Sequence, residues 1–515
     1  MPKDNNYTIN SYKEDIDKYG LKKTWHKILS KILNNEIVSN IFKIENFGEL
    51  YEIGLEYDNI ISKKEMGKYY TPKDVAVVMS EWLLPLKGSK VCDVACGTGN
   101  LILTYLELLG EYEAYKLISS GNIFLYDNDP IALEICKYSI AIKYGIELLD
   151  KINARKCDFL NKNIKLPKDC KVISNPPYYK ITTIGKNWNV TKVIEDSKEY
   201  YSSFMEKIMK QSSSSVIITP YSFMGSQKFY SLRLEMNNYN GFIVSFDNVP
   251  GNIFNGRKHG IFNSNCTNSV RAAITVIENK ESIKGFKLSP LIRFKTEERT
   301  KLLNCKTLEN LVNNDYQLIT SKERNYYKCF KDIIDIFFSW KENSNQKLGD
   351  LLTNEKNELS ICLPTTCRYF TVGAKKDLKR TGKRIIYVKD KEYYDYVYCM
   401  MNSTFGYWHW RIYDGGINCP LTILSSIPVF YDKMNIEDKE KIHKIAKKMQ
   451  QEEEKYLVYK MNAGKPQENI KFPKEYRKEI NTIFLRTLNI ESNESILNKI
   501  HSSSIFKDCE DYNNE

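Results

Sequence analysis

Residues 91–100 read Val-Cys-Asp-Val-Ala-Cys-Gly-Thr-Gly-Asn, and this stretch predicts the fold of the first half of the chain. An apolar strand at 91–94 runs into a turn with glycines at 97 and 99, and an apolar helix begins at Leu101. In doubly wound α/β proteins such a turn brings the backbone close to a nucleotide-like ligand. A Gly-x-Gly pair alone is weak evidence, but its place between a strand and a helix strengthens it.

Apolar runs alternate with helical stretches around this turn. Strands are predicted at 123–126, 172–174, 216–219 and 272–277, with another near Ala154 and a helix from about Pro130 to Tyr144. Strands that alternate with helices predict a mostly parallel sheet covered by helices on both faces. We expect a helical N-terminal segment over 1–62, this α/β domain over 63–280, and a second domain over 281–515, where the rhythm is lost.

Two segments outside the α/β domain are expected to be helical. In the first, Trp25, Ile28, Leu29 and Ile32 fall at helical spacing and predict a face that packs on a core. In the second, Glu437 to Lys460 is predicted to be a charged helix with Ile442, Ile445 and Met449 on one face.

Composition narrows the class of protein. The 515 residues are 42% hydrophobic and 27% charged, as in globular proteins, and the net charge of +12 fits a polyanionic partner without identifying one. We expect a cytoplasmic protein without a membrane span, because neither a run of about 18 apolar residues nor a secretory signal is present. The 13 irregularly spaced cysteines argue against a disulfide framework, and their spacing predicts no metal site.

Asn175-Pro176-Pro177-Tyr178 follows the apolar run that ends at Ser174 and is an unusual way to end a strand. The Asn175 side-chain carbonyl and the Pro176 backbone carbonyl lie close together, and Tyr178 adds a flat ring. This arrangement suits a planar amino group that carries two N–H donors. Because such a group is the target of amino-methyl transfer, the motif favours a methyltransferase that acts on nitrogen.

Acidic residues follow two further strands. Asp127 ends the strand at 123–126, where an acid binds ribose hydroxyls in doubly wound folds; its alternative is a helix cap before Pro130, which Asp129 fits better. Asp158-Phe159 follows the strand near Ala154 and could accept from an adenine amino group or be a plain loop.

An element upstream of the glycine turn has two compatible interpretations. Thr71 could cap a helix that starts at Pro72, and the N-terminus of that helix could also hold a carboxylate.

In this order the motifs resemble those of the gamma class of DNA adenine-N6 methyltransferases, which are found in type II restriction-modification systems or as orphan enzymes. That class has a Tyr-Thr-Pro element, a D-x-x-x-G-x-G-N turn, an acid after the second strand, a D-F pair and N-P-P-Y. Beyond 280, Met401-Asn402-Ser403 with Trp408 and Trp410 looks like part of the family's C-terminal domain.

The resemblance implies a class I S-adenosylmethionine-dependent methyltransferase fold. This fold is α/β, a Rossmann-like seven-stranded mixed sheet with one antiparallel strand, over 63–280, followed by a C-terminal α+β target-recognition domain. The implied reaction is methyl transfer from S-adenosylmethionine to N6 of an adenine flipped out of double-stranded DNA.

The resemblance also implies roles for individual residues. The implied catalytic residues are Asn175, Pro176, Pro177 and Tyr178. The implied cofactor contacts are Tyr70, Thr71, Asp93, Ala95, Gly97, Gly99, Asn100, Asp127, Asn128, Asp158, Phe159 and Asn175. Tyr178 would stack on the flipped adenine, with Phe254 as the second aromatic and Phe262 as its rival.

Basic residues in the second domain are candidates for DNA contacts. Lys375, Lys376, Lys379, Arg380, Lys383 and Arg384 form a cluster that could neutralise phosphates or be a solvated surface. Arg368 and Tyr369 are candidates for reading bases. In the first domain, Lys186 and Trp188 lie in a segment that could close over the target or be a plain surface loop.

Other functions remain open at this point. Methyltransferases of ribosomal RNA bases and of protein glutamine also use N-P-P-Y, and a non-catalytic DNA-binding subunit of a modification complex is a third possibility. We expect a monomer with double-stranded DNA as its partner, and a separate cognate restriction endonuclease is left open.

Overall fold

The computed structural model describes residues 7–34, 42–58, 71–254, 270–279, 282–321, 325–367, 371–462, 464–491 and 497–507. The chain divides into two compact units. Unit 1 comprises residues 1–288 and 296–324, and unit 2 comprises residues 289–295 and 325–515. Unit 1 therefore includes the segment 296–324, which lies beyond the boundary at 281 that the sequence suggested.

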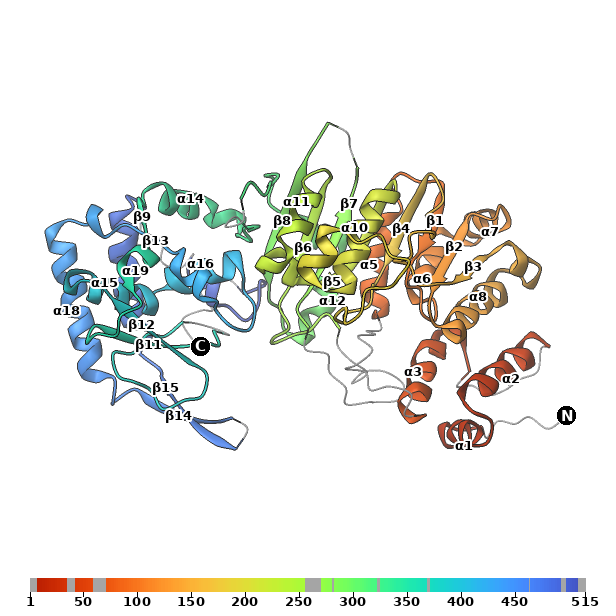
Figure 1. The fold of residues 1–515 in the computed structure, drawn as a ribbon, viewed down its shortest axis with the longest axis horizontal. Helices are drawn as coiled ribbons and strands as arrows, with labels where there is room; N and C mark the ends of the chain where they lie inside the picture. Colours follow the sequence, from red (N-terminus) through yellow and green to blue (C-terminus); the bar gives the residue numbers. More distant parts are fainter. Residues whose placement is uncertain are drawn as a thin grey trace. The chain divides into compact units, whose positions relative to one another are not determined.

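A mixed sheet organises unit 1 (Figure 1), in the strand order β3-β2-β1-β4-β5-β7-β6-β8. β1 lies parallel between β2 and β4, whereas β7 is antiparallel to both β5 and β6. The predicted class I methyltransferase sheet is confirmed, and β8 adds an eighth strand to the seven that were expected. The strands are β1 (Lys90–Asp93), β2 (Ile123–Asp127), β3 (Asn153–Lys156), β4 (Cys170–Ser174), β5 (Ser214–Pro220), β6 (Asn240–Phe246), β7 (Ala272–Ile277) and β8 (Gly285–Ile292).

Amphipathic helices pack against this sheet. In α5 the side chains of Val75, Val78, Met79 and Trp82 recur at helical spacing and are buried. Residues of α8 contact β2 and β3, and residues of α10 contact β5. The helices are α5 (Lys73–Leu83), α6 (Asn100–Leu109), α7 (Glu111–Ser119), α8 (Pro130–Tyr144), α9 (Lys192–Ser197), α10 (Tyr200–Gln211), α11 (Tyr230–Met236), α12 (Arg299–Leu302) and α13 (Cys305–Asn310).

The N-terminal segment forms a small helical core on α8. It contains α1 (Ile9–Tyr19), α2 (Leu21–Leu33) and α3 (Phe47–Tyr57). Trp25, Ile28 and Leu29 are buried there, as their spacing predicted, and the same core includes Ala132 and Ile135 of α8. This packing fixes α3 against the helix that follows β2.

Unit 2 has a helical core with short strands. Its Trp-rich segment is buried: Trp408 and Trp410 expose 2% and 1% of their surface. The helices are α14 (Ile334–Glu342), α15 (Lys391–Asn402), α16 (Thr404–Tyr413), α17 (Leu421–Ser425), α18 (Ile436–Glu452) and α19 (Lys474–Thr487). The strands are β9 (Gln346–Lys347), β10 (Leu352–Thr353), β11 (Ser360–Pro364), β12 (Lys383–Val388), β13 (Pro428–Val429), β14 (Leu457–Asn462) and β15 (Lys465–Ile470).

The predicted helix from Glu437 to Lys460 is wrong in its last turns. α18 ends at Glu452, although Ile442 and Met449 are buried as predicted. Strand β14 begins at Leu457, where Leu, Val and Tyr follow one another; β-branched and aromatic residues favour strands over helices. None of the described helices is long and apolar enough to cross a membrane.

Candidate functional site

The predicted motifs meet at one edge of the sheet in unit 1. β1 ends at Asp93, β2 ends at Asp127, and Asn175 directly follows the last residue of β4. Because these strands are parallel neighbours, their carboxyl ends lie side by side. Between β1 and β4 the strand order reverses, and open α/β sheets bind ligands in the crevice at such a point.

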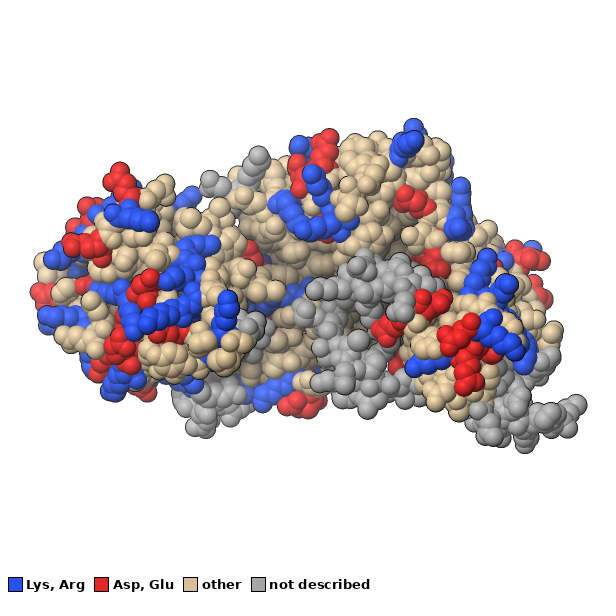
Figure 2. Space-filling view, turned by 60° about the horizontal axis from the view of Figure 1, so that its bottom comes forward, with Lys and Arg blue, Asp and Glu red and all other residues tan. Residues whose placement is uncertain are grey.

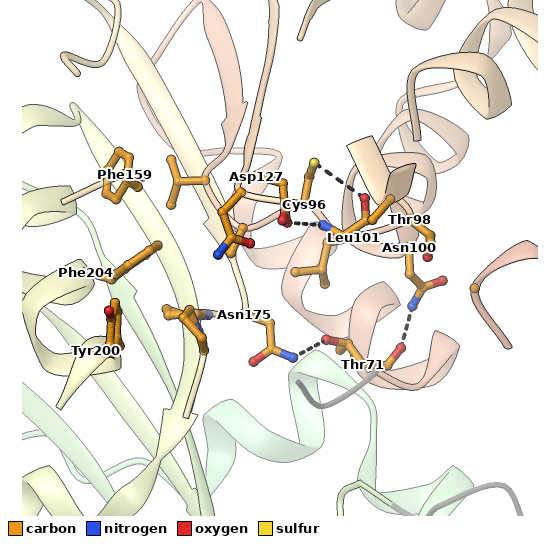
Figure 3. Close-up of a pocket in the computed structure, with 18 of the residues that line it drawn as sticks. Thr71, Cys96, Thr98, Asn100, Leu101, Asp127, Phe159, Asn175, Tyr200 and Phe204 are labelled. Atoms are coloured by element: carbon orange, nitrogen blue, oxygen red, sulfur yellow. Dashed lines mark hydrogen bonds between the residues drawn. The ribbon is translucent and has the colours of Figure 1, made fainter. Parts of the chain in front are cut away.

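A cavity of about 570 Å³ opens at this edge (Figure 3). Eleven of the residues singled out from the sequence line it: Thr71, Ala95, Gly97, Asn100, Asp127, Asn128, Asp158, Phe159, Asn175, Pro176 and Pro177. Asp93, Gly99, Tyr178 and Phe254 are not among its lining residues. Tyr70 lies outside the described residues.

Asp127 fastens the glycine turn to the end of β2. Its carboxylate accepts hydrogen bonds from the backbone N–H of Gly97 at 2.8 Å and of Asp129 at 2.9 Å. Gly97 has a φ of +51°, and nothing lies within 4 Å of where its Cβ would be. Gly99 serves packing instead, because a Cβ there would lie 2.6 Å from the Cys136 sulfur on α8. Asp129 caps α8, as predicted, by accepting from Ile131 and Ala132.

Asp93 lies beneath the turn and is fully buried. One of its carboxylate oxygens accepts from the Ala95 backbone N–H at 3.4 Å. Burial raises the pKa of Asp93 to about 8, because a carboxylate in an apolar environment loses its hydration.

The target motif is held by the Tyr-Thr-Pro element. The Asn175 side-chain Nδ2 donates to Thr71 Oγ1 at 3.0 Å, and the Asn100 Nδ2 donates to the Thr71 backbone carbonyl. Thr71 is 3% exposed, and its hydroxyl does not cap α5, whose cap residue is Pro72 without a side-chain bond. With its nitrogen turned to Thr71, the Asn175 amide directs its oxygen away from that residue (Figure 3).

An aromatic wall surrounds the Asp158-Phe159 pair. The Phe159 ring lies 5.0 Å from that of Phe204, and both line the cavity. Asp158 accepts from the Leu160 backbone N–H at 3.0 Å and from the Trp188 indole N–H. Trp188 is 8% exposed, so it packs against this pair and is not part of a plain surface loop.

Lys207 stabilises the segment that carries Phe159. Its ammonium donates to the backbone carbonyls of Phe159 and Asn161 and lies 4.6 Å from the centre of the Phe159 ring. Burial lowers the pKa of Lys207 to about 8. This contact fixes the position of Phe159.

Tyr178 and Phe254 are neighbours outside the cavity. Their ring centres are 6.1 Å apart and the rings meet edge to face at 68°, while the Tyr178 hydroxyl donates to the Ile218 carbonyl at 3.1 Å. Arg299 holds the backbone next to Phe254 by donating to the carbonyls of Asn252 and Ile253. The rival Phe262 lies outside the described residues.

Helix α3 contributes a wall of the cavity that sequence reasoning missed. Its cavity-lining residues are Gly48, Tyr51, Glu52, Leu55 and Glu56. The Tyr51 hydroxyl donates to Asp129 at 2.8 Å, which joins α3 to the cap of α8. No motif marked this helix, because its cavity-facing residues are separated from the glycine turn along the chain. Tyr179, Tyr200 and Phe204 also line the cavity without having been predicted.

The charge of the cavity is one-sided. The described acidic lining residues are Glu52, Glu56, Asp127 and Asp158, and the described lining contains no Lys, Arg or His. Such a lining favours a ligand that carries net positive charge.

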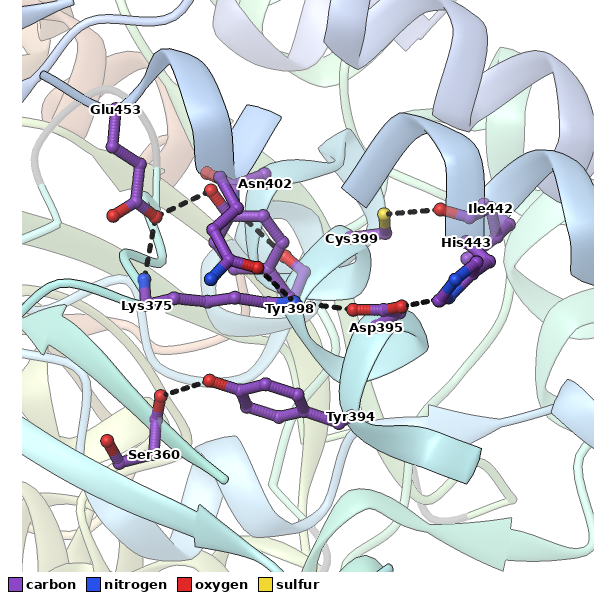
Figure 4. A network of polar contacts seen from close by, with 11 residues as sticks. Ser360, Lys375, Tyr394, Asp395, Tyr398, Cys399, Asn402, Ile442, His443 and Glu453 are labelled. Atoms are coloured by element: carbon purple, nitrogen blue, oxygen red, sulfur yellow. Dashed lines mark hydrogen bonds and ion pairs between the residues drawn. The ribbon is translucent and has the colours of Figure 1, made fainter. Parts of the chain in front are cut away.

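The basic cluster of unit 2 is largely engaged within its own unit. The Lys375 side chain is 6% exposed and pairs with Asp395 (Figure 4). Lys376 pairs with Glu454, and Lys383 pairs with Asp377.

The remaining members of the cluster differ in their exposure. Arg380 and Arg384 donate to backbone carbonyls, whereas Lys379 is exposed. Basic and acidic side chains are intermingled on the face of the molecule that Figure 2 shows. The six residues therefore do not form one continuous basic patch, and Arg368 and Tyr369 lie outside the described residues.

Residues 43–258 match the protein family described as N-6 DNA Methylase. This match confirms the family resemblance that the motifs predicted. The chain is similar to the methylase subunit of the type I restriction enzyme MjaIX from Methanocaldococcus jannaschii, with 32% identity over 150 residues, which are 29% of this chain and 25% of the relative.

Two further similarities extend over more of the chain. The methylase subunit of the type I restriction enzyme MpnII from Mycoplasma pneumoniae is 21% identical over 369 residues, 67% of this chain and 64% of the relative. The cryo-EM structure of a DrdV–DNA complex has a TM-score of 0.45 at 12% identity, covering 79% of this chain and 59% of that chain. The chain thus spans 25% and 64% of the lengths of the two curated relatives.

Proposed function

Given the N-6 DNA methylase match of residues 43–258, we propose that this chain is a site-specific adenine-N6 DNA methyltransferase that uses S-adenosylmethionine. Unit 1, whose sheet extends the domain expected at 63–280 by strand β8, forms its catalytic domain, and unit 2 forms its target-recognition domain. One observation carries the proposal: the Asn175 amide follows β4 beside a ligand-sized cavity, and Thr71 fixes which way it points.

The cavity fits S-adenosylmethionine in size and charge. A volume of about 570 Å³ lies within the range of small-molecule sites, and the cofactor carries net positive charge, which suits four acidic side chains. When bound, the cofactor supplies an electrophilic methyl group on a sulfonium. Asp127 binds the ribose of the cofactor, and Asp158 and Phe159 contact its adenine. The turn at Ala95 and Gly97 contacts its methionine part. Thr71 can donate its hydroxyl proton to the cofactor carboxylate while accepting from Asn175.

The catalytic residues act on the amino group of the target. Its nitrogen is a poor nucleophile, because its lone pair is delocalised into the ring. Acceptance of its two hydrogens by Asn175 Oδ1 and the Pro176 carbonyl favours the pyramidal, positively charged transition state. A preorganised partner of this kind contributes about 3 kcal/mol. Thr71 is a positioning residue, because it holds the amide with its oxygen toward the target.

The target base must leave the duplex to reach this motif, at a cost of a few kcal/mol. Tyr178 stacks on the extruded adenine. Phe254 lies edge-on to Tyr178, so its ring must turn or shift to serve as the second stacking surface. Arg299 positions the segment that carries Phe254.

The partner of the catalytic domain is double-stranded DNA in the cytoplasm. Lys379 is the basic residue of the 375–384 cluster whose side chain is exposed, and Lys376, Arg380, Lys383 and Arg384 can contact phosphate only by leaving their present partners. Lys375 is the least available, because its side chain is buried. The chain acts as a monomer or with a separate restriction endonuclease.

Methylation-aware sequencing tests the proposal. Unmethylated genomic DNA is exposed to the purified protein and S-adenosylmethionine. The proposal predicts N6-methyladenine at a defined sequence. Methylation of RNA or of protein glutamine in parallel reactions, with unmodified DNA, would overturn it.

A further inference from the structure

We propose that the β14–β15 hairpin of unit 2, with strands Leu457–Asn462 and Lys465–Ile470, is a DNA-contacting ribbon that enters the major groove of the target duplex. The inference rests on the proposed function, and it names the element that reaches the DNA. The evidence is the exposure of the hairpin, the charge of its lysines, and its hydrogen bonds to the neighbouring loop.

The hairpin is a regular two-stranded ribbon. Its strands pair from Leu457 opposite Ile470 to Asn462 opposite Lys465. At its base, Ile470 packs into a small core with Val372 and Leu378, while the paired strands extend away from the helices of their own unit (Figure 1). Among the described residues, β14 pairs with β15 alone, so its outer edge is open.

The two faces of the ribbon differ in chemistry. Tyr459 and Met461 point to one face, and they are 67% and 70% exposed. Lys460 and the residue opposite Asn462, Lys465, point to the other face. Large exposed apolar side chains on an open strand edge mark an interaction site.

The charges around the ribbon favour a polyanion over a protein partner. Lys379, Lys460, Lys465 and Lys471 are exposed, and none has an acidic partner among the described residues. Two acids beside the ribbon are buried, since Glu453 and Glu468 are 4% and 5% exposed, and the exposed Glu454 pairs with Lys376. A ribbon whose lysines are exposed while these acids are buried or paired is complementary to phosphate.

The loop that carries Lys379 is fastened to the ribbon. Glu468 accepts from the Lys379 backbone N–H at 2.7 Å, and Gln467 accepts from that of Thr381 at 2.7 Å. Glu453 accepts from the backbone N–H of Lys375 (Figure 4) and from that of Lys376. Because the loop is already ordered by these acceptors, little conformational entropy is lost when it binds.

The dimensions of the ribbon match a DNA groove. Paired strands lie about 4.8 Å apart, and the major groove of B-DNA is about 12 Å wide and admits a two-stranded ribbon. Lysines on the ribbon and on the adjoining loop then meet the phosphates along the groove. Tyr459 and Met461 meet base edges, where apolar side chains contact thymine methyl groups.

The test compares two matched pairs of exposed lysines in unit 2. Lys460→Gln/Lys465→Gln removes two charges from the ribbon, and Lys444→Gln/Lys447→Gln removes two from the exposed side of α18. Binding of the full chain to a fluorescent duplex of random sequence is measured by anisotropy from 50 to 300 mM salt. Each lost phosphate contact lowers the slope of log affinity against log salt by about 0.9, so the ribbon pair lowers it by about two and the α18 pair leaves it unchanged.

Several outcomes would overturn the assignment. If the slope of log affinity against log salt is unchanged in the ribbon pair, or changes equally in both pairs, the ribbon does not contact the DNA. Concentration-dependent dimers that Tyr459→Pro abolishes would assign the open edge to a second copy of the chain, because the Tyr459 N–H lies on that edge. If the wild type methylates DNA while the ribbon pair keeps its slope, the ribbon assignment fails alone. If the wild type modifies no DNA, the proposed function fails irrespective of the slopes.

Discussion

Replacing Thr71 by valine tests how the target motif is oriented. Valine has nearly the shape of threonine but lacks the hydroxyl that accepts from Asn175 Nδ2 at 3.0 Å. Thr71 is 3% exposed, so little water can replace the lost partner. The Asn175 amide is then free to turn and to present nitrogen where the target needs oxygen.

The magnitude follows from the loss of one partner of a buried hydrogen bond. Leaving a buried donor unsatisfied costs about 1–3 kcal/mol, and a barrier raised by that amount slows the reaction roughly 5- to 150-fold. The loss is expected in the single-turnover methylation rate at saturating S-adenosylmethionine, where cofactor affinity no longer matters. Thr71→Ser keeps the hydroxyl and is expected to restore the rate to within about threefold, or ~0.65 kcal/mol.

A second threonine provides a matched control. Thr104 is also buried, and its hydroxyl donates to the Asn100 carbonyl at 2.7 Å without touching Asn175. Thr104→Val is expected to lower thermal stability and to leave the single-turnover rate unchanged. If Thr71→Val weakens cofactor binding but reacts at the wild-type rate when saturated, Thr71 serves the cofactor only and the orienting role is refuted.

Three further predictions concern the cavity. Asn175→Ala is expected to lower the methylation rate by about 10²–10³-fold while calorimetric cofactor affinity is retained, and a rate near that of the wild type would contradict its role. Glu52→Gln is expected to lower the affinity for S-adenosylmethionine about fivefold and to lower the affinity for S-adenosylhomocysteine, which lacks the sulfonium charge, much less. If calorimetry shows an equal loss of affinity for both ligands, α3 has no electrostatic role in binding. Burial raises the Asp93 pKa from 3.8 to about 8, so the folded state binds this proton more tightly than the unfolded state does. The free energy of unfolding of the wild type therefore falls as the pH rises from about 4 to about 8. The fall is at most about 1.4 kcal/mol per pH unit. Asp93→Asn should remove this fall, so its melting temperature relative to the wild type should increase between pH 5 and pH 8.5; a constant difference would show that Asp93 does not titrate in this range.

The sequence predicted the parts of the site whose chemistry is local. The glycine turn, Asp127, Asp158 and Asn175 each end or follow a strand, and parallel pairing alone brings such positions to one edge of a sheet. Asp129 could be assigned as a helix cap because a cap and its proline have a fixed spacing. These residues needed no knowledge of distant contacts.

The residues that sequence reasoning missed depend on contacts between distant segments. Helix α3 reaches the cavity because its core packs on α8, and the bond between Tyr51 and Asp129 joins residues 78 positions apart. The Thr71 hydroxyl accepts a hydrogen bond from Asn175, which lies 104 positions later in the chain. This tertiary contact takes the place of the helix cap that the local sequence suggested. Gly99 was assigned to the ligand, yet its neighbour is Cys136.

The 375–384 segment was interpreted from its charges alone, and charges do not reveal their partners. Asp395 lies in α15, and Glu453 and Glu454 lie in the turn after α18; all three come later in the chain and engage much of the cluster. The β14–β15 hairpin gave no signal because its lysines are dispersed along both strands. Only their pairing places Lys460 and Lys465 on one face.

The central claim is that Asn175 delivers an adenine amino group to a methyl donor in the cavity. Its most direct test is incubation of unmethylated duplex DNA with the protein and methyl-labelled S-adenosylmethionine, followed by digestion and mass spectrometry of the nucleosides. We expect labelled N6-methyldeoxyadenosine with the wild type and, in the same incubation time, at least about a hundredfold less with Asn175→Ala. Label that appears in the DNA equally with both proteins, or only in RNA or protein, would contradict it.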